Sequence, residues 1–328
     1  MKADGSALDR TIETLARRLL ESRTPSGSWE GALASSALST ATAIVALTLA
    51  DRKCGGSHRD LVRSGIGWLI ATQNADGGWG DTVISFTNLS TTVLCWAALT
   101  AGHSYHPNAA DALERAQTWL RAQIGDLNPD RLKAAVLDRY GKDQTFSVPI
   151  LTVLAIAGKL GSGARAWRRV PQLPFELAAF PHRWFQWLRL PVVSYALPAL
   201  VAIGQVRHHR AASRNPLTRP LRSVLRTRTL TKAREMQPAS GGYLEATPLT
   251  AFVVMSLIEG GRGSHSIVTD GLRFLRESVR PDGSWPIDTN LSTWVTTLSV
   301  KALSENPMFS EDDRKTTLRW LVDRKSVV

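Results

Sequence analysis

The strongest constraint on the fold is a set of six apolar segments that recur about every 50 residues. Each begins near a small hydroxyl residue and continues with alanine, valine and leucine on all sides, as in "ALSTATAIVALTLA" and "NLSTTVLCWAALTA". A helix that is apolar all round is buried all round. We therefore predict six inner helices, anchored at Ser39, Ser90, Ser147, Ser194, Thr247 and Ser292.

Amphipathic segments lie between the inner helices. Sequences such as "LDRTIETLARRLLES" and "ADALERAQTWLRAQI" carry one apolar stripe among charged residues, which is typical of helices that cover a core from outside. A repeat of this period indicates that each unit packs against its neighbours. The sequence predicts an all-α fold, a single (α/α)6 toroid domain spanning residues 1–328.

A glycine-rich turn ending in an aromatic residue joins outer to inner helices at four places. These turns are "TPSGSWEG", "QNADGGWG", "QPASGGY" and "RPDGSWP". Glycine permits the left-handed backbone that follows the outer helix, and the aromatic ring is expected to pack over the next repeat. The first role of these turns is structural.

The turns and inner helices resemble the Gln-Trp repeats of the squalene-hopene cyclase and oxidosqualene cyclase family. The match is best at residues 73–79 and weaker at 237–243, whereas Arg23 and Val279 take the glutamine place in the other two turns. Members of that family carry two such barrels, and this chain has length for one. It is therefore most similar to the single-domain class II cyclases that act on prenylated aromatic substrates.

The resemblance implies a proton-initiated terpene or meroterpenoid cyclase, an isomerase or lyase that needs no metal or organic cofactor. Its expected substrate is a polyprenyl chain or a prenylated aromatic molecule. The family supplies its proton from an Asp-x-Asp-Asp run, and this sequence contains no such run. The alternative is a non-catalytic isoprenoid-binding or scaffold protein on the same barrel.

Parallel inner helices would gather their N-termini at one end of the barrel, together with the acids that precede them. A helix N-terminus favours a carboxylate, while burial retains its proton. We predict Asp288 as the proton donor, Asp143 as a second donor or partner, Glu245 as the third candidate, and Asp81 as a turn residue. The alternative is that each acid caps its helix.

Aromatic side chains would stabilise the carbocations by roughly 0.5 to 2 kcal/mol each. The candidates on or just before inner helices are Phe86, Trp96, Phe146, Tyr195, Phe252 and Trp294. Some of them are expected to be ordinary core residues, because a helix buried all round turns part of its surface away from the cavity.

Metal-dependent chemistries fit the sequence less well. The segment "EDDRKTT" lacks the last acid of the DDxxD run of class I terpene synthases. Neither Cys54 nor Cys95 has the neighbours of a prenyltransferase zinc set. His208 and His209 are expected in a basic loop, so no metal site is predicted.

Positive charge is concentrated in a basic, aromatic-containing region at residues 165–234. It holds fourteen Lys or Arg and one acid, Glu176. The cluster of Trp184, Phe185 and Trp187 is followed by an arginine-rich loop at 207–234, which suits a headgroup layer. We predict peripheral membrane attachment through 173–234. The alternative is a solvated loop beside a packed aromatic helix.

Arginines such as Arg222, Arg226 and Arg228 are the side chains expected to meet anionic lipid. No recognition motif supports nucleic-acid binding. The N-terminus lacks the apolar stretch of a signal peptide, and no segment offers about 18 uninterrupted apolar residues. The expected location is cytoplasmic, with attachment to the inner membrane face.

Overall fold

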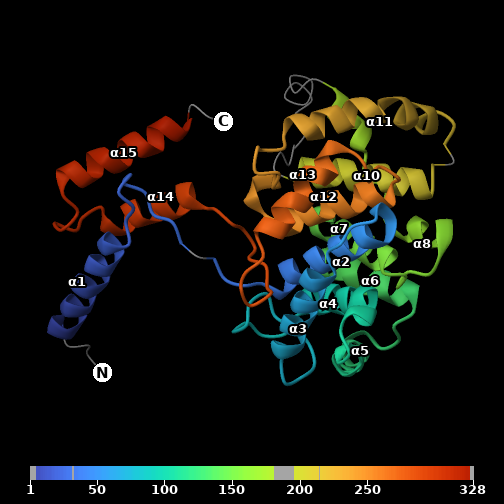
Figure 1. Ribbon diagram of the computed structural model, residues 1–328, viewed down its shortest axis with the longest axis horizontal. Coiled ribbons are helices and arrows are strands. Elements are labelled where there is room, and N and C mark those ends of the chain that lie inside the picture. Colours follow the sequence, from blue (N-terminus) through green and yellow to red (C-terminus); the bar gives the residue numbers. More distant parts are fainter. Residues whose placement is uncertain (1–4, 32, 181–195, 214, 326–328) are drawn as a thin grey trace. The chain divides into compact units, whose positions relative to one another are not determined.

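The computed structural model describes residues 5–31, 33–180, 196–213 and 215–325, and the all-α prediction is confirmed over these ranges (Figure 1). Isolated bridges are the only β pairing in this part of the chain. Tyr195 and the aromatic cluster at 184–187 lie outside the described residues. The helices are α1 (Gly5–Glu21), α2 (Ala37–Cys54), α3 (Arg59–Ala71), α4 (Leu89–Gly102), η1 (His103–Tyr105), α5 (Ala109–Ile124), α6 (Pro129–Tyr140), α7 (Gln144–Ile156), α8 (Gly163–Arg169), η2 (Phe175–Ala179), α10 (Leu197–Arg210), α11 (Thr218–Glu235), η3 (Tyr243–Glu245), α12 (Thr247–Glu259), α13 (Ser266–Glu277), α14 (Ser292–Leu303) and α15 (Glu311–Lys325).

The chain divides into two compact units. Unit 1 comprises Met1–Leu33 and Asp288–Val328, and unit 2 comprises Ala34–Ile287. Unit 2 contains five of the six predicted inner helices, and the sixth, α14, lies in unit 1. That residues 1–328 form one toroid domain stays a prediction.

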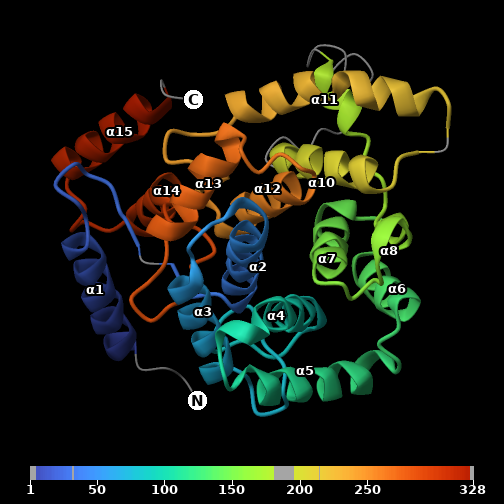
Figure 2. The same cartoon turned by 45° about the vertical axis from the view of Figure 1, so that its right-hand side comes forward.

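The five inner helices of unit 2 form a ring. Helix α2 contacts α4, α4 contacts α7, α7 contacts α10, α10 contacts α12, and α12 contacts α2. Helices α3, α5, α8, α11 and α13 lie outside this ring (Figure 2). The layering of inner and outer helices agrees with the apolar patterns, since α2 is buried almost throughout from Ala37 to Ala50, whereas α13 buries one stripe.

The arginine-rich segment predicted as a loop at 207–234 is helical, so that prediction is wrong. His208 and His209 belong to the last turn of α10, and most of the rest forms α11. Arginine and leucine are good helix formers, and α11 buries Thr229, Leu230 and Ala233 against unit 2. The arginines of this segment therefore belong to a helix that has one buried face.

The four aromatic turns share one hydrogen-bond pattern. In each, the aromatic N–H or O–H donates to a carbonyl in the last turn of the preceding outer helix, where carbonyls lack intrahelical partners. The pairs are Trp29 with Leu19, Trp79 with Leu69, Tyr243 with Ala233 and Trp285 with Leu275. The backbone N–H of the same residue donates to a threonine hydroxyl of an inner helix: Thr296, Thr92, Thr250 and Thr40, respectively.

Two of these turns do not dock on the inner helix that follows them in sequence. Trp79 meets α4 and Tyr243 meets α12, which follow directly, but Trp285 meets Thr40 of α2. Within unit 1, Trp29 meets α14. The turn at 279–285 thus closes the ring of unit 2 by packing back on its first inner helix.

Unit 1 has a small core of its own. Ala16, Trp29, Leu303 and Phe309 are buried together, and the rings of Trp29 and Phe309 meet edge to face. Arg23, which takes the glutamine place of its turn, forms an ion pair with Asp313 at the start of α15. An arginine at that place is therefore matched by an acid on the neighbouring outer helix.

Candidate active site

The N-terminal ends of α12 and α2 are joined through the segment that follows α13. The backbone N–H of Thr247, the first residue of α12, donates to the carbonyl of Ile287 at 2.9 Å. Two residues earlier, Trp285 donates to Thr40 in the first turn of α2 at 3.0 Å. The starts of these two inner helices therefore lie on the same side of the ring.

The N-terminal ends of α4 and α7 lie on this side as well. Ser36, the N-cap of α2, forms an antiparallel bridge with Thr82 in the loop before α4. The hydroxyl of Tyr140, four residues before α7, donates to Ser90 Oγ at the start of α4 at 2.7 Å. The predicted gathering of inner-helix N-termini is thus present for α2, α4, α7 and α12, and we call this end of unit 2 the N-terminal mouth.

Asp81 lies at the mouth, in the loop before α4. Its Oδ1 accepts hydrogen bonds from Asn88 Nδ2 at 3.0 Å and from Thr91 Oγ1 at 2.5 Å. The pKa of Cys95, inside α4, is raised by burial and by the nearby charge of Asp81. The carboxyl is exposed and braces the start of α4, as expected for a turn residue.

Asp143 is the N-cap of α7. Its Oδ1 accepts from the hydroxyl and from the backbone N–H of Thr145, the latter at 2.8 Å. These hydrogen bonds lower the pKa of the exposed carboxyl. The geometry supports capping, and an ionised carboxylate accepts hydrogen bonds instead of donating a proton.

Glu245 ends the short helix η3 at the mouth. It and Leu244 have positive φ angles of 57° and 53°, a region that side chains other than glycine rarely occupy. Its Oε1 accepts from Ser240 Oγ at 2.5 Å. The strained backbone holds the half-buried carboxylate over the turn at 237–243.

The pKa of Asp288, the predicted proton donor, is raised. The cause is desolvation of the half-buried carboxyl. It is the first residue of the second segment of unit 1 and precedes α14 by four residues. A carboxyl that keeps its proton more readily than usual has the chemistry of a general acid.

Two aromatic candidates lie at the mouth. Phe146, in the first turn of α7, stacks on Tyr140 with 5.7 Å between ring centroids. Phe86 lies in the loop before α4 and is 97% exposed. Tyr140 was not predicted as a site residue from the sequence, because it ends α6 and does not belong to the inner helix α7 that follows.

The other aromatic candidates are placed differently. Phe252 is half-buried on α12 and packs against the core of unit 2. Trp96 is buried, and Lys159 Nζ lies 4.1 Å from its ring centroid, so a protein cation already covers that ring. Trp294 belongs to α14 in unit 1 and is 61% exposed.

Exposed apolar side chains accompany the polar groups of the mouth. Val83, Ile84 and Phe86 stand in the loop before α4, with Phe146 on α7 and Leu244 in η3. All five are more than half exposed. We call these five side chains the apolar rim, which suits an apolar partner or substrate.

The opposite end of unit 2 is charged. Glu259, at the end of α12, accepts from Lys53 of α2 and Arg210 of α10, each at 2.5 Å. A hollow of about 590 Å³ beside this ion-pair cluster is lined also by Cys54 and His209. The two ends of the ring thus differ, one with carboxylates and apolar side chains and the other with an ion-pair cluster of one carboxylate and two cations.

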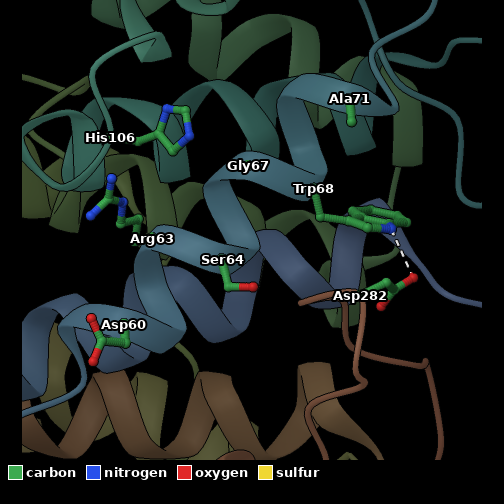
Figure 3. Close-up of a pocket in the computed structure, with 8 residues that line it drawn as sticks. All are labelled: Asp60, Arg63, Ser64, Gly67, Trp68, Ala71, His106 and Asp282. Atoms are coloured by element: carbon green, nitrogen blue, oxygen red, sulfur yellow. Dashed lines mark hydrogen bonds between the residues drawn. The ribbon is translucent and has the colours of Figure 1, made fainter.

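A second hollow, of about 530 Å³, lies on the outer helix α3 (Figure 3). Its polar lining includes Asp60, Arg63 and His106, and Trp68 Nε1 donates to Asp282 Oδ2 at 3.1 Å. Burial acts to raise the pKa of Asp282, but hydrogen bonds from Ser284 and Trp68 outweigh it and the pKa is lowered. The lowered pKa makes Asp282 a poor proton donor.

Among the described residues, no group of three or more His, Cys, Asp or Glu side chains is arranged to hold a metal ion. Nor does any helix in the described ranges combine the length and apolar character needed to cross a membrane.

Comparison with known proteins gives one family. Residues 12–154 match the model of the squalene-hopene cyclase N-terminal domain. A similar solved structure is that of the type II terpene cyclase MstE from Scytonema in its apo form, with 14% identity, 85% of this chain and 81% of that chain covered, and a TM-score of 0.34. No protein with a curated description matches. The predicted resemblance to the squalene-hopene cyclase family is confirmed, on the match over residues 12–154.

Proposed function

We propose that this protein is a class II terpene or meroterpenoid cyclase, which folds a polyprenyl chain and closes rings after protonating it. The observation that carries the proposal is the family match over residues 12–154, which covers the whole of α2 and α4 and nearly all of α7. Those helices provide much of the N-terminal mouth. The apolar rim there supports entry of a lipid-soluble substrate.

In this proposal Asp288 donates the proton. Its carboxyl proton adds to a terminal alkene, and the electron pair of the next double bond attacks the resulting cation, so that rings close in succession. Loss of a proton from the last cation ends the reaction, and the product is an isomer of the substrate. The raised pKa of Asp288 supports its role, because the donor must be protonated before the reaction.

The carboxylates of the mouth, which belongs to unit 2, are assigned a separate role. Asp143 accepts two hydrogen bonds and has a lowered pKa, which suits a charged group and not the initial donor. Asp81 and Glu245 would add negative charge near a developing cation. Phe146 would offer a ring face, worth roughly 0.5 to 2 kcal/mol of cation stabilisation.

Peripheral membrane attachment is proposed through the outer surface of α11. Leu217, Leu221 and Val224 lie at helical spacing and are 79%, 44% and 77% exposed. Arg219 and Arg228 on the same segment are exposed. An apolar stripe flanked by arginines is typical of helices that lie in the headgroup layer.

The test is product analysis with prenylated aromatic acids and linear polyprenes, read by NMR because cyclisation leaves the mass unchanged. Asp288→Asn is expected to lower turnover by at least about a hundredfold with near-normal melting. Asp143→Asn is the matched control, since asparagine still caps α7. Binding of these substrates by the wild-type protein without turnover would favour the isoprenoid-binding scaffold instead.

A further inference from the structure

A buried charged cluster lies between η2, α10 and α11, in the wall of unit 2. Glu176 Oε1 accepts from a terminal nitrogen of Arg222 at 2.9 Å, and the two side chains are only 9% and 12% exposed. His208, 4% exposed, lies with Nε2 3.2 Å from Ser223 Oγ. We call Glu176, His208, Arg222 and Arg226 the α10–α11 cluster.

Four polar atoms of this cluster are buried without a hydrogen-bond partner in the described part of the chain. They are Glu176 Oε2, His208 Nδ1, Arg222 Nε and Arg226 Nε. The side chains act on one another electrostatically, since the charges of Arg222, Arg226 and Glu176 all bear on His208. Because buried polar groups are rarely left unpaired, four in one cluster indicate that an occupant belongs there.

The hydrogen-bonding character of the four atoms can be assigned. Ser223 Oγ uses its proton on the carbonyl of Arg219 at 3.0 Å, so His208 Nε2 must be the donor to that oxygen. Burial and the charges of Arg222 and Arg226 lower the pKa of His208, which keeps the ring neutral and leaves Nδ1 an acceptor. The cluster therefore presents two unpaired N–H donors, from Arg222 and Arg226, and two unpaired acceptors.

The charge of the cluster indicates that the occupant is an anion. The cluster holds two guanidinium groups and one carboxylate, and the carboxylate pairs with Arg222. Burial and the charge of Arg262 lower the pKa of Arg226, as expected where a cation lacks compensation. Glu176 is the only acid in residues 165–234, so no other part of that region brings a second carboxylate. Glu259, the last residue of α12, is already paired with Lys53 and Arg210.

We propose that the α10–α11 cluster is a binding site for a phosphate group that carries a proton, either inorganic phosphate or a phosphate monoester. Its unprotonated oxygens accept from Arg222 Nε and Arg226 Nε, and its P–OH donates to Glu176 Oε2 or His208 Nδ1. Sulfate at neutral pH has no proton to donate, so Glu176 excludes it. The site is separate from the N-terminal mouth and does not depend on the proposed cyclase activity.

The test is calorimetric titration of the full chain with inorganic phosphate and with sulfate at matched ionic strength. Phosphate is expected to bind at least about tenfold more tightly than sulfate. A sulfate oxygen would lie against the buried Glu176 Oε2, and two acceptors cannot form a hydrogen bond. In Glu176→Gln the new amide donates to sulfate, so this preference is expected to vanish or reverse. Equal binding of both ions, or binding of neither, in the wild-type protein overturns the proposal and leaves ordered water as the occupant.

Matched arginine variants locate the site. Arg226→Gln is expected to weaken phosphate binding by about tenfold or more, as for loss of a charged hydrogen-bond partner. Arg228→Gln removes the same charge from an exposed position on the same helix and is expected to leave binding unchanged. Equal loss in both variants would contradict a specific site. If Glu176→Gln fails to fold, the two arginine variants and the preference of the wild-type protein for phosphate over sulfate still test the proposal.

A competition experiment identifies the source of the phosphate. Vesicles of phosphatidylcholine with phosphatidic acid, which carries a phosphate monoester, are added to protein loaded with inorganic phosphate. If the vesicles displace inorganic phosphate from the wild-type protein but not from Arg226→Gln, the occupant of the site is a lipid headgroup. Retention of phosphate supports the site with a soluble phosphate. Displacement that Arg226→Gln leaves unchanged contradicts the assignment to this cluster.

Discussion

Replacement of Trp79 tests how the aromatic turns hold unit 2 together. The indole is 1% exposed, and its Nε1 donates to the Leu69 carbonyl at 2.9 Å. That carbonyl lies in the last turn of α3, where no backbone N–H of the helix can reach it. The backbone N–H of Trp79 donates to Thr92 of α4. One residue thus fills the core, caps an outer helix and joins it to an inner helix.

The two side-chain contributions can be separated. Trp79→Ala removes both the buried ring and the cap, and should lower the free energy of unfolding by about 3 to 5 kcal/mol. Trp79→Phe keeps most of the apolar surface but leaves the Leu69 carbonyl without its donor, which costs about 1 to 3 kcal/mol. Both variants keep the backbone bond to Thr92. The assay is urea unfolding followed by circular dichroism at 222 nm.

A matched control is available on α5. Trp119 is half-buried, and its Nε1 donates to Asp76 Oδ2 at 3.2 Å near the surface. Trp119→Phe should therefore change the unfolding midpoint less than Trp79→Phe. If Trp79→Ala cost less than about 1 kcal/mol, the ring would not be the buried wedge described above, and the account of the repeat would be wrong.

Three further predictions concern other parts of the chain. The raised pKa of Asp288 means that the folded state binds the carboxyl proton more tightly than the unfolded state does. The free energy of unfolding should therefore fall as the pH rises from the ordinary carboxyl pKa through the raised pKa of the folded protein. Thermal melts of Asp288→Asn should lack this dependence on pH. Leu221→Gln with Val224→Gln should weaken partition into anionic vesicles without changing the melting temperature, because both side chains are exposed. Gln73→Ala should destabilise by about 1 to 3 kcal/mol, measured by urea unfolding, because the Gln73 amide donates to the Gly77 and Ala112 carbonyls.

The inner helices were predictable because their signal is local. Thr247 and Ser292 are the first residues of α12 and α14, and Ser147 lies three residues inside α7. In these cases an apolar run bounded by a hydroxyl residue marked the start of a helix. It did not fix the burial of α14, which was predicted to be buried on every side but buries Ser292, Thr296, Ser299 and Leu303 and leaves Trp294 61% exposed, so that part of the prediction is wrong. The turns were predictable for the same reason, since Gly77 has the left-handed φ of 93° that the pattern required.

The docking order of the turns was not predictable from these local signals. Trp29 and Trp285 both follow the pattern Pro-x-Gly-Ser, and Thr40 and Thr296 both lie near the starts of their helices. Nothing local states that Trp285 meets Thr40 while Trp29 meets Thr296. The pairing of Arg23 with Asp313 provides a specific match within unit 1, but it joins residues 290 positions apart.

Side-chain direction on α11 was also beyond the sequence. Arg222 was expected to meet lipid, yet it points inward to Glu176. Three arginines of α11 thus differ in burial. Arg222 is internal, Arg226 has a buried Nε, and Arg228 is exposed. Because η2 and α10 pack against one face of α11, the arginines on that face are internal and those on the other face are exposed. Glutamine variants at Arg222 would therefore report on an internal ion pair and not on membrane attachment.

The acids illustrate why position before an inner helix is an insufficient criterion for a proton donor. Asp143 and Asp288 both lie four residues before the predicted anchor of an inner helix. Hydrogen bonds from Thr145 lower the pKa of Asp143, whereas desolvation raises that of Asp288. The same residue at the same spacing is thus a helix cap with a lowered pKa in one place and a half-buried acid with a raised pKa in the other. The difference arises from what surrounds each carboxyl, so the comparison of Asp288→Asn with Asp143→Asn tests the environment and not the spacing.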